Sequence, residues 1–429
     1  MRFGTDGIRG VYPSEINETT ARSLGFALSA MRPGCVTVVG RDTRSSGESL
    51  ADALCSAIEY CGGIAIDVGI VPTAGVAYLT SEYSADFGVV VSASHNPREY
   101  NGLKVFGRGG FKLSDAEERR VEALLSSAPV KAHGGRRIRA GGAVRTYAAY
   151  IASKAGGCLS GVRVLLDCAD GAAGAAAPLA FELAGACATC INTRSDGAFI
   201  NDGSGALFAD RLTEKAKLFD ATFAFDGDAD RVIALGASGR IVNGDHAVNI
   251  LAGDMKEKGT LARDSAVGTI MTNSGVEKAL AAKGITLVRT AVGDKYVLRE
   301  MLSEGYKIGG EQAGHVIMSD VLPTGDGIAT ALALCAVSAR KGKSPDELDD
   351  AEDMPQFSAS VKAQREIVQT DVYMDFMRKF RASRPGCRIV VRASGTEPVI
   401  RISAESEDAD EAQNAVRELI GFVRRYGEA

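Results

Sequence analysis

The chain has 429 residues, of which 45% are hydrophobic, and a formal net charge of −5 at pH 7. This length and apolar content are sufficient for large buried cores and suggest two to four domains. The negative net charge and the single short basic run, GGRRIR at residues 134–139, argue against a nucleic-acid partner.

The chain also lacks the marks of membrane insertion and of a disulfide framework. Its start, MRFGTDGIRG, has early charges and no apolar signal-peptide core. The most apolar stretch, residues 171–191, contains Pro178 and Glu182 and suits a packed helix better than a membrane span. Nine cysteines are scattered, and the single C-x-x-C, Cys187 to Cys190, falls in an expected strand. We expect a cytoplasmic protein with reduced thiols and no membrane partner; metal binding by the C-x-x-C pair is a minor alternative.

Three segments repeat the order strand, turn, helix, glycine, strand. They cover residues 36–69, 162–193 and 267–290, and in the first of them apolar residues recur at helical spacing between Leu50 and Cys61. Each segment closes its helix with a glycine before the next strand. The repetition predicts three mixed α/β domains built on βαβ units.

The last part of the chain follows a different pattern. After Met354-Pro355 come a strand, a helix, a strand-loop-strand at residues 387–405 and a helix at about residues 408–426, which predicts a smaller α+β domain. The predicted domains are residues 1–145, 146–246, 247–355 and 356–429.

The first domain contains a serine in an unusual setting. The stretch VVVSASHNPREYNGLKVF, residues 89–106, reads as a buried strand that ends in turn chemistry at Asn96-Pro97, so Ser94 should lie on an exposed loop. Such a serine commonly bonds only its own backbone. A hydrolase nucleophile is weakly supported, because no G-x-S-x-G elbow surrounds Ser94 and the chain has only four histidines.

The second domain contains three closely spaced carboxylates. In FAFDGDADRVIAL, Asp226, Asp228 and Asp230 alternate with small residues directly after an apolar strand, so they should converge on a hard divalent cation. An EF-hand is excluded, because its sixth and twelfth positions would be Arg231 and Ala237. An acidic surface turn is the remaining alternative, although three carboxylates at this spacing would repel one another without a counter-ion.

Two further loops are less specific by themselves. GGEQAGHVIMSD, residues 309–320, is a glycine-punctuated turn, and VRASGTEPVIRI, residues 391–402, offers hydroxyls, backbone amides and two arginines to a phosphate. A plain hairpin turn explains the second loop equally well. The only GKS, residues 342–344, lacks the upstream glycine of a P-loop.

Together, these four loops resemble the α-D-phosphohexomutase superfamily, whose members carry a serine loop S-A-S-H-N-P, a metal loop D-G-D-x-D-R, a sugar loop G-E-x-S-G-H and a phosphate loop R-x-S-G-T-E-P. All four occur here in that order along the whole chain. Within the superfamily, the opening FGTDGIRG and the Gln of GEQAGH look most like bacterial phosphoglucosamine mutases.

The resemblance implies an isomerase with its active site in a central cleft between the four domains. Ser94, as phosphoserine, would pass its phosphoryl group to a hexosamine phosphate through a hexose 1,6-bisphosphate, which also serves as activator. It would bind one Mg²⁺ together with the three aspartates. The residues that the resemblance implies for catalysis are Ser94, His95, Lys104 and Arg9, with Lys104 in acid-base catalysis. Those implied for substrate binding are Arg231, Glu311, Ala313, His315, Arg392, Ser394, Gly395, Thr396 and Arg401.

One departure leaves the substrate open. Ala313 stands where the sugar loop of the superfamily usually has a serine, so a hydroxyl that could contact the sugar is missing. A mutase for glucose or mannose phosphates therefore stays an alternative, as does a sugar-phosphate-binding protein without catalysis. The oligomeric state, monomer or homodimer, is also open.

Overall fold

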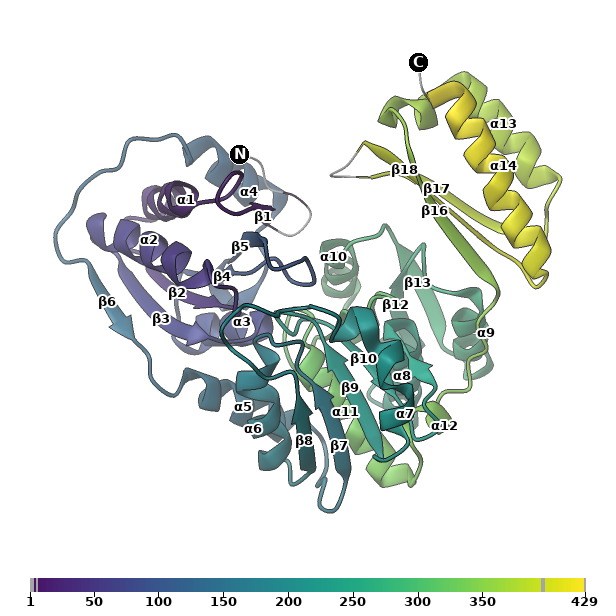
Figure 1. Cartoon of the computed structure of the whole chain (residues 1–429), viewed down its shortest axis with the longest axis horizontal. Helices are drawn as coiled ribbons and strands as arrows, with labels where there is room; N and C mark the ends of the chain where they lie inside the picture. Colours follow the sequence, from purple (N-terminus) through teal and green to yellow (C-terminus); the bar gives the residue numbers. More distant parts are fainter. Residues whose placement is uncertain (1–3, 5–6, 395–397, 428–429) are drawn as a thin grey trace.

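The computed structural model describes residue 4, residues 7–394 and residues 398–427, and these residues form four sheets that follow one another along the chain (Figure 1). The sheets have six, five, four and three strands. The expected fold class, three mixed α/β units and a smaller α+β unit, is confirmed. The division at residues 145, 246 and 355 stays a prediction.

The first sheet has the strand order β1-β5-β4-β2-β3-β6, in which β2, β3, β4 and β6 are parallel and β5 runs against β4. Its central strands are apolar because both faces are covered. Val39 and Val89 pack in one cluster with α1 and α2, whereas Val38 and Val90 pack in another with α3. The elements are β1 (Ile8–Val11), α1 (Glu18–Met31), β2 (Val36–Arg41), α2 (Gly47–Tyr60), β3 (Ile64–Ile70), α3 (Thr73–Glu82), β4 (Phe87–Val91), β5 (Tyr100–Phe106), η1 (Arg108–Gly110), α4 (Asp115–Leu124), β6 (Arg136–Arg139) and α5 (Ala143–Lys154).

The second and third sheets, of order β11-β10-β9-β7-β8 and β13-β12-β14-β15, share one apolar core. The core is continuous because α11, which follows the third sheet in the chain, contacts α5, α6 and β9 of the preceding units. The elements of the second sheet region are β7 (Arg163–Asp167), α6 (Ala173–Leu183), β8 (Cys187–Ile191), η2 (Ala206–Leu212), α7 (Thr213–Ala216), β9 (Ala221–Phe225), β10 (Val232–Leu235) and β11 (Ile241–Val242). Those of the third are α8 (Gly244–Glu257), η3 (Ala262–Asp264), β12 (Ser265–Thr269), α9 (Ser274–Ala282), β13 (Thr286–Thr290), α10 (Asp294–Glu304), β14 (Ile308–Gly310), β15 (Val316–Met318), α11 (Gly327–Lys341) and α12 (Pro345–Leu348).

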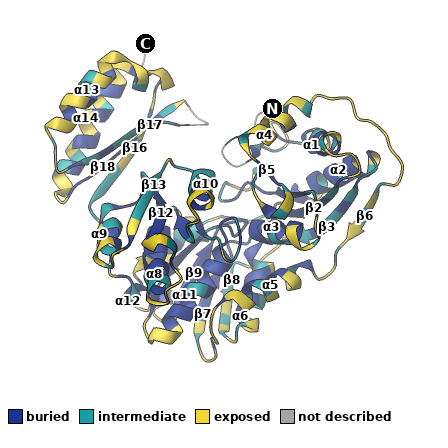
Figure 2. Ribbon diagram, turned by 180° about the vertical axis from the view of Figure 1, so that it is seen from behind, coloured by how far each residue is buried: buried dark blue, intermediate teal, exposed yellow. Residues whose placement is uncertain are grey.

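The last unit stands apart from the other three and is joined to them beside α9 (Figure 1). Its antiparallel sheet, of order β16-β18-β17, carries α13 and α14 on one face, and the exposed sides of these helices point outward (Figure 2). Arg388 anchors the unit, since its guanidinium donates to the carbonyls of Ile270 (2.6 Å) and Thr272 (2.9 Å) and pairs with Glu405. The elements are β16 (Gln356–Lys362), η4 (Arg365–Gln369), α13 (Asp371–Ala382), β17 (Arg388–Ala393), β18 (Val399–Glu405) and α14 (Ala409–Gly427).

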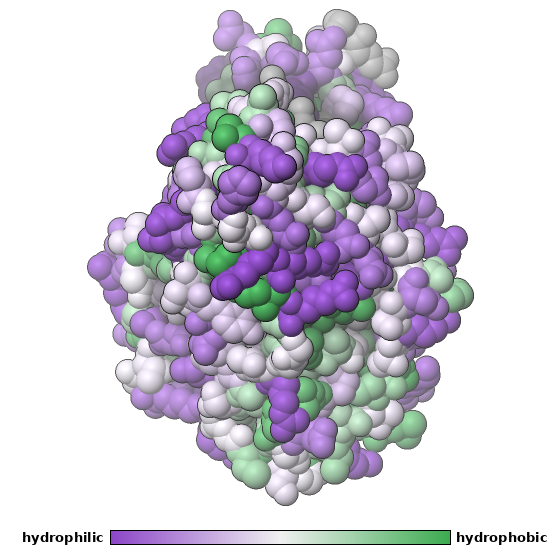
Figure 3. Space-filling model, turned by 90° about the vertical axis from the view of Figure 1, so that its left-hand side faces the viewer, coloured by the Kyte–Doolittle hydropathy of each residue, from purple (hydrophilic) through white to green (hydrophobic). Residues whose placement is uncertain are grey.

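The face in Figure 3 is mostly hydrophilic, and its hydrophobic residues form small separate groups. None of the described helices is long and apolar enough to cross a membrane. All nine cysteines are free thiols, and Cys187 and Cys190 both lie in β8, as predicted.

A buried histidine at the start of α8 holds the segment that leads to the last unit. His246 Nδ1 lies 2.6 Å from Asp349 Oδ2, and its Nε2 lies 3.1 Å from Asp353 Oδ1. Although burial opposes it, hydrogen bonds and attraction from these carboxylates raise the pKa of His246 to about 9. The imidazolium is therefore the form that both carboxylates bind.

This arrangement predicts a pH-dependent contribution to stability. Because the folded-state pKa of His246 lies above the unfolded value, its contribution is complete below about pH 6.5 and is lost as the pH rises through about 9. The variant His246→Gln should melt at a lower temperature than the wild type at pH 6.5, and the two melting temperatures should converge by pH 10. A difference that persists unchanged across this range would contradict the assignment.

Candidate active site

The serine loop leaves the first sheet at the carboxyl end of β4. Ser94 lies three residues after the strand, has a φ of +53° and is fully buried, so it is not exposed as its loop position predicted. Its hydroxyl donates to Asp226 Oδ2 at 2.7 Å and lies 3.4 Å from His95 Nδ1. The burial arises because the metal loop of the second unit packs directly against this loop.

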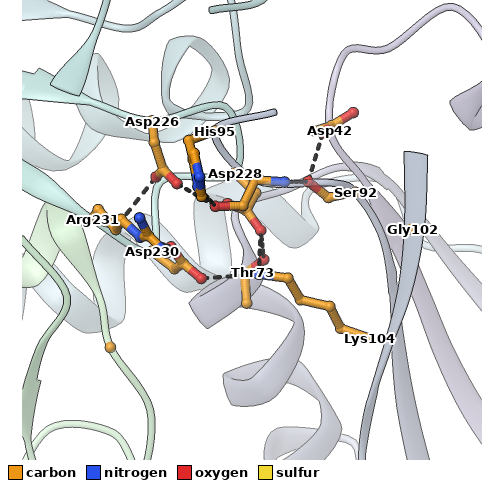
Figure 4. A network of polar contacts seen from close by, with 12 residues as sticks. Asp42, Thr73, Ser92, His95, Gly102, Lys104, Asp226, Asp228, Asp230 and Arg231 are labelled. Atoms are coloured by element: carbon orange, nitrogen blue, oxygen red, sulfur yellow. Dashed lines mark hydrogen bonds and ion pairs between the residues drawn. The ribbon is translucent and has the colours of Figure 1, made fainter. Parts of the chain in front are cut away.

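The three aspartates follow β9 and lie close together (Figure 4). Asp226, Asp228 and Asp230 are buried, and one carboxylate oxygen from each lies within 4.8 Å of the others. The turn that brings them together includes Ala229 at a φ of +55°. The convergence expected from the alternating aspartates is therefore present, and the alternative of an exposed acidic turn is wrong.

Side chains of the first unit reach the same aspartates. Lys104, on β5, donates from Nζ to Asp228 Oδ2 (2.7 Å) and Asp230 Oδ2 (2.9 Å). Thr73, at the start of α3, donates from Oγ1 to Asp228 Oδ2 at 2.5 Å. The first and second units thus meet at this carboxylate cluster (Figure 4).

Burial and mutual repulsion disfavour the negative charges of the three carboxylates. Burial, Asp230 and Asp228 raise the pKa of Asp226 well above its usual range. Burial also acts on Asp230, but the Lys104 ammonium and His315 outweigh it and lower the pKa of that carboxyl. Among the described residues, Asp228 Oδ1 and Asp230 Oδ1 are buried without a hydrogen-bond partner. Buried carboxylate oxygens left without donors suit a hard divalent cation, and these residues fit one.

Two arginines, Arg9 and Arg231, act on His95 of the serine loop. Burial and the positive charges of Arg231 and Arg9 lower the pKa of His95 to about 4. His95 is therefore neutral at pH 7. The backbone N–H of Arg231 donates to Asp226 Oδ1 at 3.1 Å, which fixes this arginine beside the metal loop.

The predicted sugar loop connects β14 and β15 and approaches the same cluster. His315 Nδ1 lies 3.8 Å from Asp230 Oδ1, and its Nε2 lies 3.4 Å from Asp294 Oδ2. Burial lowers the pKa of His315, but the two aspartates outweigh it and raise that pKa overall. Glu311 accepts a 2.9 Å hydrogen bond from the N–H of Gly293, while Ala313 is exposed.

The arginines of the predicted phosphate loop lie on the last sheet, on the face turned away from its helices. Arg392 and Arg401 are opposite each other on β17 and β18, and they line a cavity of about 300 Å³ together with Met271. Burial and the charge of Arg401 lower the pKa of Arg392, which indicates two like charges that an anion would stabilise. Ser394 is buried, and its N–H donates to Val399 O at 2.8 Å; Gly395 and Thr396 lie outside the described residues.

Sequence reasoning missed several residues that support the site. Thr73 and Asp294 contact predicted site residues, and Arg44 and Asn201 bind the backbone of the serine loop. Only Arg44 had a usable signal, because it follows β2 at the same sheet edge as Ser94. The others become neighbours of the site only through contacts between distant segments.

Comparison with known proteins gives matches along the chain. Family models match residues 1–131 (phosphoglucomutase/phosphomannomutase, alpha/beta/alpha domain I), 243–354 (domain III) and 359–421 (C-terminal domain). A phosphoglucosamine mutase of Pelotomaculum thermopropionicum is 40% identical over 440 residues, covering 99% of this chain and 99% of that protein. One of Mycolicibacterium paratuberculosis is 42% identical over 426 residues, covering 96% of each.

Solved structures share the fold at lower identity. A phosphoglucomutase/phosphomannomutase family protein of Burkholderia thailandensis superimposes with a TM-score of 0.84 at 23% identity, covering 99% of this chain and 98% of that one. The N-acetylphosphoglucosamine mutase of Aspergillus fumigatus, in complex with GlcNAc-6P and magnesium, gives 0.74 at 18% identity, covering 100% and 96%. The chain therefore belongs to the phosphoglucomutase/phosphomannomutase family of the α-D-phosphohexomutase superfamily and is an isomerase of the mutase type.

Proposed function

We propose that the chain interconverts glucosamine 6-phosphate and glucosamine 1-phosphate through a phosphoserine at Ser94 and glucosamine 1,6-bisphosphate. The observation that carries this proposal is the 2.7 Å hydrogen bond from Ser94 Oγ to Asp226 Oδ2, at the edge of three buried aspartates. The proposed substrate is supported by two relatives that match nearly the whole chain and are phosphoglucosamine mutases.

The reaction consists of two phosphoryl transfers. In the first, the bond between phosphorus and Ser94 Oγ breaks, a bond from phosphorus to a sugar oxygen forms, and the sugar hydroxyl loses its proton. In the second, the bisphosphate has turned around, and its other phosphoryl group returns to Ser94. Lys104, as the neutral amine, would take the proton of the sugar hydroxyl in the first transfer and, as the ammonium, would return it to the sugar oxygen that the second transfer releases; Asp228 and Asp230 hold its Nζ at 2.7 Å and 2.9 Å.

Asp226, Asp228 and Asp230 would hold one Mg²⁺ with the phosphoserine as a further ligand, since their carboxylates converge and Asp228 Oδ1 and Asp230 Oδ1 have no hydrogen-bond partner among the described residues. When bound, Mg²⁺ supplies positive charge to the phosphoryl oxygens. His95, Arg9 and Arg231 would bind the reacting phosphoryl group, since burial and the charges of these two arginines together lower the pKa of His95.

The sugar and the second phosphate would lie between the third and last units. Glu311 and His315 would accept or donate hydrogen bonds to the ring substituents. The negative charge of Glu311 favours the charged forms of both Arg231 and Arg392. This supports a sugar site between the arginine at the reacting phosphoryl group and the arginine at the distal phosphate. The distal phosphate would be held by Arg392, Ser394, Gly395, Thr396 and Arg401.

A coupled mutase assay with glucosamine, glucose and mannose 6-phosphates tests the proposal. We expect the highest kcat/KM for glucosamine 6-phosphate, with phosphate incorporated from a hexose 1,6-bisphosphate activator. Higher efficiency with glucose or mannose 6-phosphate would assign the substrate differently within the family. No turnover with any of them, despite Mg²⁺ and activator, would favour a sugar-phosphate-binding protein without catalysis.

A cytoplasmic location and a monomeric or homodimeric state stay predictions.

The exposed Ala313 provides a further test of the sugar contacts. The variant Ala313→Ser should raise kcat/KM for glucosamine 6-phosphate by about two- to tenfold, the value of one hydrogen bond of about 0.5 to 1.5 kcal/mol. The exposed position leaves room for a hydroxyl. Glu311→Gln serves as comparison and should reduce efficiency more strongly, because it weakens a charged acceptor. Lower efficiency of Ala313→Ser with every hexose phosphate would contradict this placement of the sugar.

A further inference from the structure

Two side chains from different units bind the same two carbonyl groups of the serine loop. Arg44 Nη2 donates to Ser94 O at 2.9 Å and to Asn96 O at 2.8 Å. Asn201 Nδ2 donates to Ser94 O at 2.9 Å and to Asn96 O at 3.1 Å. We call Arg44 and Asn201 the carbonyl clamp.

Arg44 is held rigidly behind the loop. It is 1% exposed, and its other terminal nitrogen donates to Pro97 O and Tyr100 O (2.8 Å). Its Nε donates to Asp42 Oδ2 at 3.0 Å, so the buried guanidinium has a counter-charge. The same Asp42 oxygen accepts from Ser92 Oγ at 2.6 Å, and Ser92 Oγ in turn accepts from the N–H of Ser94 at 2.9 Å.

Asn201 connects the serine loop to the metal loop. Its φ is +59°, and its N–H donates to Ala169 O at 2.9 Å, so the backbone directs the amide at the serine loop. At Gly227, between two of the aspartates, an added Cβ would lie 2.6 Å from Ser94 O and 2.9 Å from Asn201 Nδ2. The metal loop therefore approaches Asn201 and Ser94 O so closely that position 227 has no room for a side chain.

We propose that Arg44 and Asn201 are positioning residues that fix the direction of the Ser94 side chain for phosphoryl transfer. The proposal rests on the proposed phosphoryl role of Ser94. A serine keeps a positive φ only where its surroundings impose it, and the clamp imposes it through the carbonyls of Ser94 and Asn96. The two donors hold the carbonyl of Ser94, and this fixes the backbone from which the side chain projects. In that backbone position the hydroxyl reaches Asp226. Transfer is sensitive to such placement, since an error of about 1 Å can reduce the rate by about 100-fold.

The variant Asn201→Gly removes the amide, and glycine accepts the positive φ without strain. We expect kcat to fall about 10- to 100-fold, with the KM for the sugar phosphate within about twofold of wild type. The matched control is Asn192→Gly. Asn192 has a φ of +51°, lies in the same unit and donates from its amide to Asp167 Oδ1 at 2.9 Å, away from the serine loop. Its kcat should stay within about twofold of wild type.

Two further measurements separate positioning from a general loss of stability. Amide hydrogen exchange at residues 93–96 should accelerate in Asn201→Gly and not in Asn192→Gly. Asn201→Asp keeps the size of the side chain but presents an acceptor to two carbonyls, so its kcat should fall below that of Asn201→Gly.

The possible outcomes distinguish the clamp from the proposed function. Wild-type kcat and unchanged exchange in Asn201→Gly, or equal kcat losses in both glycine variants, would overturn the clamp. If wild-type protein transfers no phosphoryl group, the proposed function fails, and hydrogen exchange alone then decides whether the clamp holds the loop.

Discussion

Ser94→Ala should reduce turnover by roughly four to six orders of magnitude, because it removes the atom that we propose carries the phosphoryl group. The fold should survive, since alanine fits the space of serine and the variant loses one hydrogen bond to Asp226. A coupled assay measures the rate, and thermal melting checks the fold.

Phosphopeptide mass spectrometry locates the phosphoryl group directly. After incubation with a hexose 1,6-bisphosphate, wild-type protein should carry phosphate on Ser94, and Ser94→Ala should carry none. Ser84 provides a matched control, because it is also a serine at positive φ, +49°, but is exposed at the end of α3. Ser84→Ala should retain wild-type turnover. Phosphate on another residue, or an active Ser94→Ala variant, would remove the basis of the proposed mechanism.

The sequence places both Ser94 and the aspartates just after strands. Ser94 follows β4 and Asp226 follows β9, and ligand sites in such sheets form beyond the carboxyl ends of strands. The alternation of Asp226, Asp228 and Asp230 predicted that their carboxylates converge, and the structure shows this convergence; that they hold a metal stays a prediction. The sequence alone did not predict that Ser94 is buried, because its burial depends on the second unit packing over the loop.

Other parts of the site depend on distant contacts that leave no local signal. Thr73 and Asn201 look like ordinary turn residues, and only the docking of the first unit on the second brings them to Asp228 and to Ser94. Lys104 reads as a strand lysine, and the resemblance alone singled it out before the structure placed its ammonium between two aspartates. Local patterns predict which loops carry function, whereas the residues that orient those loops require the tertiary structure.

Removal of divalent metal should abolish turnover, and added Mg²⁺ should restore it, because the buried aspartates supply the oxygen ligands that such a cation requires. Binding should also be visible without turnover. A ligand that binds only the folded protein stabilises it by about 2.7 kcal/mol at 100 times its Kd, so saturating Mg²⁺ should raise the melting temperature.

Asp228→Asn isolates the metal contribution from the rest of the site. Asparagine keeps the size of the side chain and an oxygen that can accept from Thr73, but it removes one negative charge from the cluster. We expect this variant to fold, to lose most of the Mg²⁺-dependent rise in melting temperature and to turn over slowly. Cys187→Ser is the control for the C-x-x-C pair and should keep both the wild-type rate and the metal requirement, since Cys187 is exposed on β8. Wild-type turnover in excess chelator, or an equal Mg²⁺-dependent rise in Asp228→Asn, would show that these aspartates do not hold the metal.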